Sequence, residues 1–257
     1  MSGNLVDTCE AVASLVDSIS QATTTPLLFV DLEGVNLSRH GSISIMQLLM
    51  PPSPVVHLLD VCTLQASAFD TPGTKGQTLR SLLESDRYGK VFFDVRNDSD
   101  ALFGHFGLHL KGVIDLQLVE YASRPRPGKF IKGLAKCISE SGQMSMAQTQ
   151  EWTRVKEAGQ KLFAPEKGGK YEVFNHRPLN AALRDYCVQD AMVLPKLLLV
   201  YSERLQPHMA AQIYEESQKR VALSQSPTFN GTGMHMAVAP SFRWTRYVQK
   251  VSKRDPR

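Results

Sequence analysis

The stretch Leu27-Leu-Phe-Val-Asp-Leu-Glu-Gly34 joins a fully apolar run to two acidic residues. A short, continuous apolar run such as 27–30 is typical of a strand that is buried on both faces of a sheet. Asp31 and Glu33 follow this run directly. Side chains two apart on a strand share a face and lie about 6.6 Å apart along it. We therefore predict a buried strand with a pair of carboxylates at its end.

Two carboxylates on one face of a buried strand repel each other and lose hydration. They need either raised pKa values or a cation between them. Carboxylate oxygens are ligands that suit Mg²⁺ or Mn²⁺. About one D-x-E triplet is also expected by chance in a chain of this length, so the pair alone leaves metal binding and coincidence equally open.

The sequence around this strand predicts an α/β domain with a mixed sheet. Residues 43–50 and 55–59 have the pattern of two further strands, which gives a three-stranded antiparallel meander. A fourth strand is expected at 91–93, and a strand or turn at 112–114. The expected helices cover 5–19, 78–84, 98–106, 115–121, two segments between 131 and 163, and 179–205, where Pro195 should kink or divide the helix.

The composition is that of a globular protein. The chain has 257 residues, 42% of them hydrophobic, which is enough for a proper core and excludes a mainly disordered chain. Lys and Arg (29) exceed Asp and Glu (25) by four, and this mild excess permits a polyanionic partner without requiring one. Four widely spaced cysteines, with no C-x-x-C pair, are expected to be reduced thiols of the core: Cys9, Cys62, Cys137 and Cys187.

No segment has the pattern of a membrane span or a secretion signal. The apolar run 191–201 is far shorter than the roughly 20 residues a spanning helix needs, and Pro195 and Lys196 interrupt it. Asp7 and Glu10 stand where a signal peptide carries basic residues. We therefore expect an intracellular protein without membrane contact, in the cytoplasm or the nucleus.

A second acidic site follows the strand at 91–93. Asp98 lies at a strand-to-helix transition, which is where α/β sheets present chemistry. Asp94 and Asp100 are alternatives as metal ligands, because spacing alone does not separate the three. Asp98 or Ser99 could instead cap the helix that follows, and the local pattern favours capping.

A third acidic site lies on the long C-terminal helix. Tyr186 and Asp190 are four residues apart, so they point the same way about 6 Å apart along the helix axis. An acidic residue on an otherwise apolar helix needs a partner, and Tyr186 could place a water beside a metal ion held by Asp190. The alternative is an ordinary amphipathic helix with Asp190 in solvent.

The order of these three motifs resembles that of the DEDD 3′–5′ exonucleases. Residue 185 is Asp where the other branch carries a catalytic histidine, so Tyr186 assigns the chain to the tyrosine-bearing DEDDy branch, with ribonuclease D and the Werner-type exonuclease domain. The Arg177-Pro-Leu179 motif before Tyr186 resembles most the Egalitarian-related subgroup of "exonuclease 3′–5′ domain-containing" proteins. Further matches are Asp31-Leu-Glu-Gly34, Gly41 with Ile45-Met-Gln-Leu48, Lys90-Val-Phe-Phe93 with Asn97-Asp98 and Leu102, and Ile114-Asp-Leu-Gln117.

The resemblance implies a ribonuclease H-like mixed sheet flanked by helices, in a single domain with a C-terminal extension. The expected division is an N-terminal helix at 1–25, the exonuclease domain at 26–206, and a C-terminal helix with a basic tail at 207–257. The stretch 124–169 is longer and less regular than in the compact exonucleases.

The implied activity is that of a 3′–5′ exonuclease that hydrolyses single-stranded RNA or DNA ends to nucleoside 5′-monophosphates. By the resemblance, four carboxylates hold two Mg²⁺ or Mn²⁺ ions, and Tyr186 orients the attacking water. The carboxylates are Asp31, Glu33, Asp98 and Asp190. The alternative is a catalytically inactive nucleic-acid-binding scaffold on the same fold, since some members of the subgroup have lost ligands.

Substrate contacts are expected from basic residues, because these bind backbone phosphates. Arg124, Arg126 and Lys129 form a basic loop. In the tail, basic residues could contact phosphates and two aromatic residues could stack on bases, although a solvated tail is favoured: Arg243, Arg246, Lys250, Trp244 and Tyr247.

Overall fold

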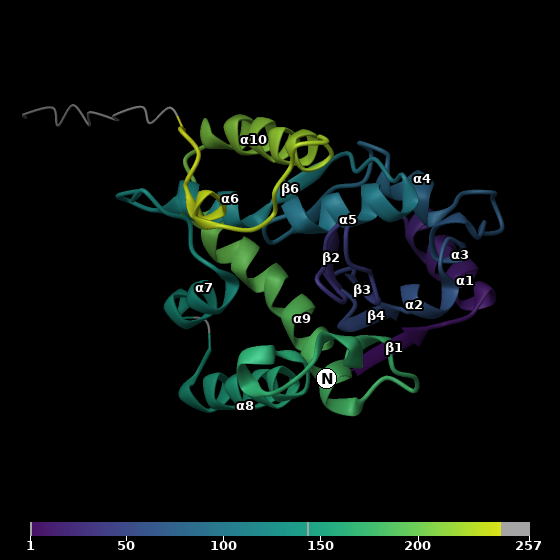
Figure 1. Ribbon diagram of the computed structural model, residues 1–257. Helices are drawn as coiled ribbons and strands as arrows, with labels where there is room; N and C mark the ends of the chain where they lie inside the picture. Colours follow the sequence, from purple (N-terminus) through teal and green to yellow (C-terminus); the bar gives the residue numbers. More distant parts are fainter. Residues whose placement is uncertain (1, 143, 243–257) are drawn as a thin grey trace, which may run out of the picture.

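The computed structural model describes residues 2–142 and 144–242, and a six-stranded mixed sheet lies at its centre (Figure 1). The strand order is β1-β4-β3-β2-β5-β6, so β2 occupies an interior position. The strands are β1 (Ser2–Val6), β2 (Leu28–Glu33), β3 (Ile45–Leu49), β4 (Val55–Leu59), β5 (Lys90–Phe92) and β6 (Val113–Asp115).

The predicted antiparallel meander is confirmed: β2 pairs antiparallel with β3, and β3 pairs antiparallel with β4. On the other side of β2, strands β5 and β6 continue the sheet in parallel pairing. The short segment predicted as a strand or turn at 112–114 is therefore a strand.

The helix predicted from residue 5 is wrong at its start, because residues 2–6 form β1 and pair in parallel with β4. Leu5 lies opposite Leu58 in this pairing. The helix begins only at Cys9, where the Thr8 hydroxyl accepts a hydrogen bond from the Ala11 N–H at 3.2 Å. A hydroxyl residue before the first turn is a preferred helix N-cap.

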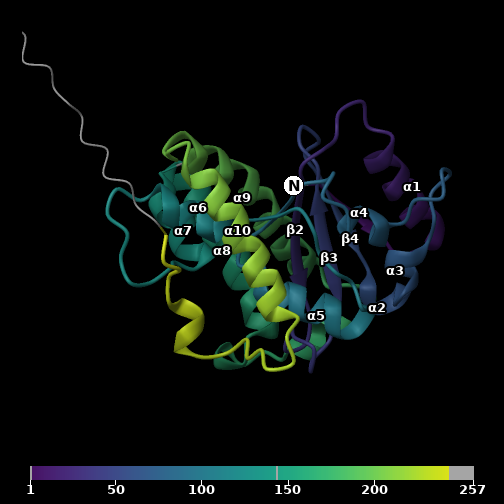
Figure 2. The same cartoon turned by 90° about the horizontal axis from the view of Figure 1, so that it is seen from above.

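Helices cover both faces of the sheet, as Figure 2 shows with the strands between two helical layers. Helices α1, α3 and α4 pack on one face, and α6 to α9 pack on the other. Helix α10 lies along β6 and α5. The helices are α1 (Cys9–Ser20), α2 (Val61–Leu64), α3 (Ser67–Asp70), α4 (Leu79–Leu83), α5 (Arg96–Phe106), α6 (Leu116–Ser123), α7 (Leu134–Ser141), α8 (Met146–Phe163), α9 (Ala181–Glu203) and α10 (Met209–Ser224). Short 3₁₀ turns add η1 (Pro165–Lys167), η2 (Tyr171–Asn175) and η3 (Met234–Ala237).

The alternation along β2 decides which face carries the acidic pair. Leu28, Val30 and Leu32 belong to the core beneath α1, α3 and α4. Phe29 belongs to the opposite core, which includes the buried side of α9. Because successive side chains on a strand alternate between faces, Asp31 and Glu33 share the face of Phe29 and lie toward α9.

Helix α9 and two of the four cysteines differ from what the sequence predicted. Helix α9 runs from Ala181 to Glu203 without a break at Pro195, so the predicted division does not occur. Cys137 and Cys187 are buried as expected, but Cys9 is exposed and Cys62 half-buried, so the prediction of four core thiols is wrong for these two. Cys9 is the first residue of α1, and Cys62 lies within α2, where its Sγ is 3.9 Å from the Asn175 carbonyl oxygen.

Within the described residues, no helix is both long enough and apolar enough to cross a membrane. The tail residues Arg243, Trp244, Arg246, Tyr247 and Lys250 lie outside the described residues, and their roles stay predictions. The three-part division of the chain at residues 25 and 206, and the intracellular location, also stay predictions.

Candidate active site

Strand β2 and helix α9 bring three carboxylates together. One carboxylate oxygen from each of Asp31, Glu33 and Asp190 lies within 4.8 Å of the other two. We call these three residues the carboxylate cluster. Asp31 and Glu33 are partly buried and Asp190 is only 3% exposed. Residues that are 157 or more positions apart in the chain thus meet where α9 crosses β2.

Helix α9 places Tyr186 one turn before Asp190 on the same side. The helix begins after Asn180, whose side chain accepts the Ala182 N–H at 2.8 Å. Tyr186 is 7% exposed, and the Phe163 ring meets its ring edge-on at a centroid distance of 5.1 Å. The alternative of Asp190 as a solvated helix residue is therefore wrong, because the turn that carries it packs against the sheet.

Asp98 lies in the first turn of α5 and is 7% exposed. It does not cap the helix, since the N-cap position is Val95 and no side chain bonds there. The favoured capping role is therefore wrong, because the helix begins two residues earlier than expected. Asp98 is not part of the carboxylate cluster, but burial and then the charge of Asp31 raise its pKa well above the usual range. The carboxylate of Asp98 therefore lies close enough to Asp31 for the two negative charges to repel each other.

The neighbouring aspartates are already paired with arginines. Asp94 accepts two hydrogen bonds from Arg96, at 2.5 and 2.6 Å. Asp100 forms an ion pair with Arg39 and also accepts the Arg39 backbone N–H at 2.8 Å. The structure therefore favours Asp98 among the three aspartates that the spacing left open.

Electrostatics make the carboxylate cluster a poor place for three negative charges. Burial, followed by the charge of Asp190, raises the pKa of Asp31 to about 7. Burial and the charge of Asp31 raise the pKa of Glu33 well above its usual range. Asp190 Oδ1 is buried without a hydrogen-bond partner among the described residues. A cluster of this kind fits a divalent cation, which supplies the missing positive charge.

The Tyr186 hydroxyl remains protonated in this environment. Burial raises the pKa of the phenol far above its usual range, and the charges of Glu33 and Asp190 raise it further. A protonated phenol can donate or accept a hydrogen bond but cannot remove a proton from water. The side chain can therefore orient a water molecule rather than act as its base.

Sequence reasoning missed two polar residues beside the cluster. Lys156 of α8 donates to Asp190 Oδ2 at 2.6 Å. Gln47 of β3 lies opposite Asp31 in the sheet, is fully buried, and neither its amide oxygen nor its nitrogen has a partner among the described residues. The pattern Trp152-x-x-x-Lys156-x-x-Gly159, with all three on one helix face, could have drawn attention to Lys156.

The predicted basic loop lies near the other end of α9. Arg124 holds Glu120 in an ion pair at 2.5 Å and donates to the Phe130 carbonyl at 2.8 Å. It lines a cavity with Tyr201, which follows Asp190 by eleven residues, or about 16 Å of helix. Arg126 and Lys129 are exposed. Substrate binding by these three residues stays a prediction, and the Arg124 donors already have protein partners.

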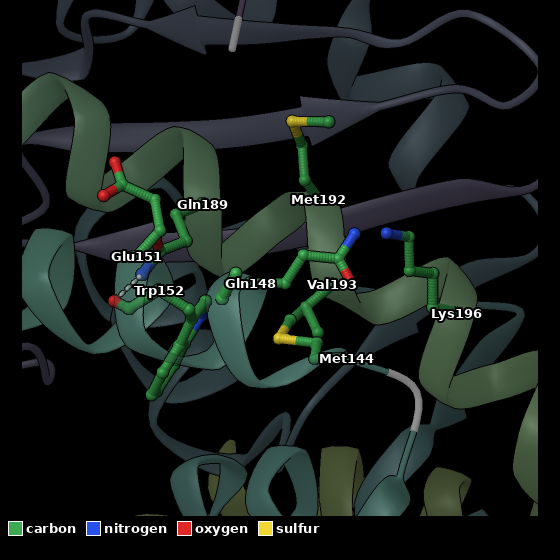
Figure 3. Close-up of a pocket in the computed structure, with 9 residues that line it drawn as sticks. Met144, Gln148, Glu151, Trp152, Gln189, Met192, Val193 and Lys196 are labelled. Carbon is green, nitrogen blue, oxygen red and sulfur yellow. Dashed lines mark hydrogen bonds between the residues drawn. The ribbon is translucent and has the colours of Figure 1, made fainter.

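A pocket of about 440 Å³ lies between α8 and α9 (Figure 3). Gln189, next to Asp190, donates to the Trp152 carbonyl at 3.0 Å, the contact that Figure 3 marks with a dashed line. Apolar side chains make most of the wall, among them Met144, Met192 and Val193. The pocket contains none of the predicted metal ligands, and Gln189 is its lining residue nearest to Asp190 in the sequence.

The fold and the acidic residues together are those of a nuclease of the DEDD type. A family model described as 3′-5′ exonuclease matches residues 4–201. The chain therefore belongs to the 3′–5′ exonuclease family, in the DEDDy superfamily, and the resemblance found in the sequence is confirmed.

Two curated relatives support the predicted subgroup. The human piRNA biogenesis protein EXD1 is 26% identical over 180 residues, which are 70% of this chain and 33% of that protein. The mouse protein of the same name is 30% identical over 116 residues, 45% of this chain and 19% of that protein. The chain thus spans a third or less of the length of these relatives.

Solved structures show that the fold is that of the RNase D exonuclease domain. Trypanosoma brucei RNase D in complex with RNA U12 superposes with a TM-score of 0.70 and 22% identity, over 93% of this chain and 76% of that one. Escherichia coli RNase D gives 0.60 and 18%, over 88% and 51%. Brucella melitensis NrnC with bound Mg²⁺ gives 0.57 and 17%, over 90% and 100%.

Proposed function

We propose that this protein is a metal-dependent 3′–5′ exonuclease that hydrolyses single-stranded nucleic-acid ends and releases nucleoside 5′-monophosphates. The observation that carries the proposal is the convergence of Asp31, Glu33 and Asp190 within 4.8 Å at the centre of an exonuclease fold. The RNA in the Trypanosoma brucei RNase D complex and the Mg²⁺ in the Brucella melitensis NrnC structure support the choice of substrate and cofactor.

The cofactors in this proposal are two Mg²⁺ or Mn²⁺ ions. Asp31, Glu33 and Asp190 would hold them, with Asp98 as the fourth carboxylate. The unpartnered Asp190 Oδ1 and the raised pKa values of Asp31 and Glu33 fit cations that restore charge balance. When bound, such ions make water nucleophilic at neutral pH and stabilise the charge of the leaving oxygen.

The remaining chemistry comes from the chain itself. The protonated Tyr186 hydroxyl would hold the attacking water by a hydrogen bond, close to Glu33 and Asp190. The sheet face and α9 exclude bulk water from one side of the cluster, which strengthens each electrostatic contact there. The mostly apolar pocket between α8 and α9 offers surface for the bases of a strand end, while Arg126 and Lys129 offer charges for its phosphates.

An inactive nucleic-acid-binding scaffold on the same fold is the alternative, and the side chains favour the enzyme. Four buried carboxylates with Lys156 as their one cationic partner among the described residues destabilise a fold that gains nothing from them, because their burial and mutual repulsion both oppose ionisation. A scaffold would have no physical reason to keep the complete set together with Tyr186.

The test is hydrolysis of single-stranded RNA and DNA oligonucleotides that carry a 5′ label. With Mn²⁺ or Mg²⁺ we expect a ladder that shortens from the 3′ end, release of 5′-monophosphates, and complete inhibition by EDTA. A substrate with a blocked 3′ end is the control and should stay intact. Tight binding of the oligonucleotides without any cleavage under these conditions would contradict the proposal and support the scaffold.

A further inference from the structure

Helix α8 contributes a positive charge to the carboxylate cluster. This helix packs beside α9, and Gly159 makes the contact close: a Cβ at this position would lie 2.7 Å from the Tyr186 Cβ. One turn before Gly159, the Lys156 side chain reaches across to α9. The glycine therefore allows the approach that brings this lysine to Asp190.

Lys156 is held by three groups at once. Its ammonium donates to Asp190 Oδ2 at 2.6 Å. It also lies 4.9 Å from the centroid of the Tyr186 ring and 5.2 Å from that of the Trp152 ring. The side chain is only 14% exposed. An ammonium in this position gains a charge-assisted hydrogen bond to the carboxylate and cation–π contacts with two aromatic rings, which a fully solvated ammonium lacks.

The charge balance of the cluster is incomplete. In the described part of the chain, Lys156 is the one basic side chain that forms an ion pair with Asp31, Glu33 or Asp190. Its charge lowers the pKa of both Asp31 and Glu33, but burial and the neighbouring carboxylates outweigh it. One ammonium thus opposes three carboxylates, and Asp190 Oδ1 still has no partner among the described residues.

We propose that Lys156 is a tethered cation that holds Asp190 in the metal-free protein and competes with the divalent ion for it. Lys156 is in this sense a positioning residue, because it acts through Asp190. The inference rests on the proposed function, since it concerns the metal site of the proposed exonuclease.

The competition follows from geometry. The ammonium at 2.6 Å occupies the coordination space of Asp190 Oδ2, and a divalent ion bound to that oxygen would lie beside a like charge. The repulsion between charges a few ångströms apart is large where water is excluded. A metal ion that uses Oδ2 must therefore displace the ammonium, and one that binds only the unpartnered Oδ1 still lies close to this like charge. In both cases part of the binding free energy is spent against Lys156.

The test is calorimetric titration of Mn²⁺ into metal-free protein, for wild type, Lys156→Met and the control Lys161→Met. Methionine retains the length of the side chain without its charge, and Lys161 is an exposed lysine on the same helix. We expect Lys156→Met to bind Mn²⁺ at least about tenfold more tightly than wild type, because repulsion and competition are both removed. Lys161→Met should bind like wild type.

Equal or weaker Mn²⁺ binding by Lys156→Met, with wild type binding normally, would overturn the role of Lys156 and leave the proposed function intact. Absence of Mn²⁺ binding in all three proteins would instead contradict the proposed metal site itself. Tighter binding by both lysine variants to the same degree would also overturn the inference, since it would reflect general surface charge.

Thermal melting gives a second readout that also covers a destabilised variant. Without metal, Lys156→Met should melt below wild type, because the carboxylates lose their counter-charge. With saturating Mn²⁺ the stabilisation should be larger for Lys156→Met than for wild type. Lys156→Gln should behave like Lys156→Met, and an Mn²⁺-induced shift equal to that of wild type in both variants would overturn the inference.

Discussion

Two groups of buried and half-buried acids lie on one sheet of this molecule, and they differ in how their charge is balanced. The first is the carboxylate cluster on β2 and α9. The second, at the ends of β5 and β6, consists of Asp94 and Asp115 with Arg96 and Arg220, and we call it the arginine-paired group. The two groups belong to the same sheet but have different partners.

Each acid of the arginine-paired group accepts hydrogen bonds from an arginine. Asp115 is fully buried and accepts hydrogen bonds from Arg220 at 2.7 Å and from the backbone N–H groups of Asp94 and Gln117, both at 3.0 Å. Its carboxylate fixes the turn between β5 and α5, and Arg220 ties that turn to α10. These acids are therefore part of the structure.

In the carboxylate cluster only Asp190 has a basic partner among the described residues, Lys156, and burial together with the neighbouring carboxylates raises the pKa of Asp31 and Glu33. A fold gains no stability from acids that it buries without arginines or backbone donors. Charge balance, more than burial or acidity, therefore separates the proposed metal-binding carboxylates from the structural ones in this chain.

The largest expected effect is on activity. Asp31→Asn should lower the rate of 3′-end hydrolysis by about a thousandfold or more, because a bound metal ion stabilises the transition state by several kcal/mol. Single-turnover assays on a labelled oligonucleotide would measure it. Asp185→Asn is the matched control, since Asp185 is exposed beside Tyr186, and it should retain the wild-type rate. Equal losses in both variants would contradict the special position of Asp31.

The second effect is on stability. It should be large in the arginine-paired group and small in the carboxylate cluster. Arg220→Met should lower the free energy of unfolding by about 3–5 kcal/mol, because it leaves Asp115 buried without its charge partner. Asp31→Asn in EDTA should be neutral or stabilising, because it removes repulsion. Urea denaturation of both variants measures the contrast. A loss for Asp31→Asn as large as that for Arg220→Met would erase the distinction between the two groups.

A smaller effect concerns pH. The pKa of Asp31 is raised from 3.8 to about 7, so the folded metal-free protein holds a proton that the unfolded chain has released. Its contribution to stability is therefore lost as the pH rises from about 4 to about 7. Urea denaturation in EDTA across this window should show a steeper decline for wild type than for Asp31→Asn. Equal slopes of unfolding free energy against pH for the two proteins would contradict the raised pKa of Asp31.

An arginine-paired acid elsewhere should show the reverse dependence. Burial acts to raise the pKa of Asp60, but hydrogen bonds from Arg177 and Thr63 outweigh it and the pKa is lowered. The stability that this carboxylate contributes is present above its ordinary pKa of 3.8 and is lost as the pH falls through the lower folded value. The acid limb of the same urea series should therefore become shallower in Asp60→Asn.

The smallest effect is expected on the outer side of α8. Arg154 and Glu151 form an exposed ion pair at 2.7 Å, on the same helix as Lys156. Exposed pairs contribute little because solvent screens them. Arg154→Ala should leave both the melting temperature and the Mn²⁺ affinity unchanged. A shift in affinity would mean that the whole helix, and not Lys156 alone, tunes the site.

Strand and helix periodicity in the sequence predicted which site residues share one face of the same strand or helix. The apolar run at 27–30 and the D-x-E that follows placed two acids on one strand face, and the four-residue spacing placed Tyr186 above Asp190. Both outcomes depend only on strand and helix periodicity. The paired strands at 43–59 were also predictable from local sequence, since three prolines at positions 51, 52 and 54 end one strand before the next begins.

Contacts between distant segments account for what the sequence did not reveal. Asp98 and Asp100 look equivalent locally, and the pairing of Asp100 with Arg39, 61 residues away, separates them. Lys156 is 34 residues from Asp190, and its place depends on how closely Gly159 lets two helices pack. Strand β1 is short and gains its order from pairing with β4, which no local pattern in residues 2–6 announces.

The most direct test of the account is the anomalous scattering from crystals grown with Mn²⁺. We expect two Mn²⁺ peaks bounded by Asp31, Glu33, Asp98 and Asp190, with the Lys156 ammonium moved away from Asp190. A map with no peak at the carboxylate cluster, and with Lys156 still bound to Asp190 at saturating Mn²⁺, would contradict it.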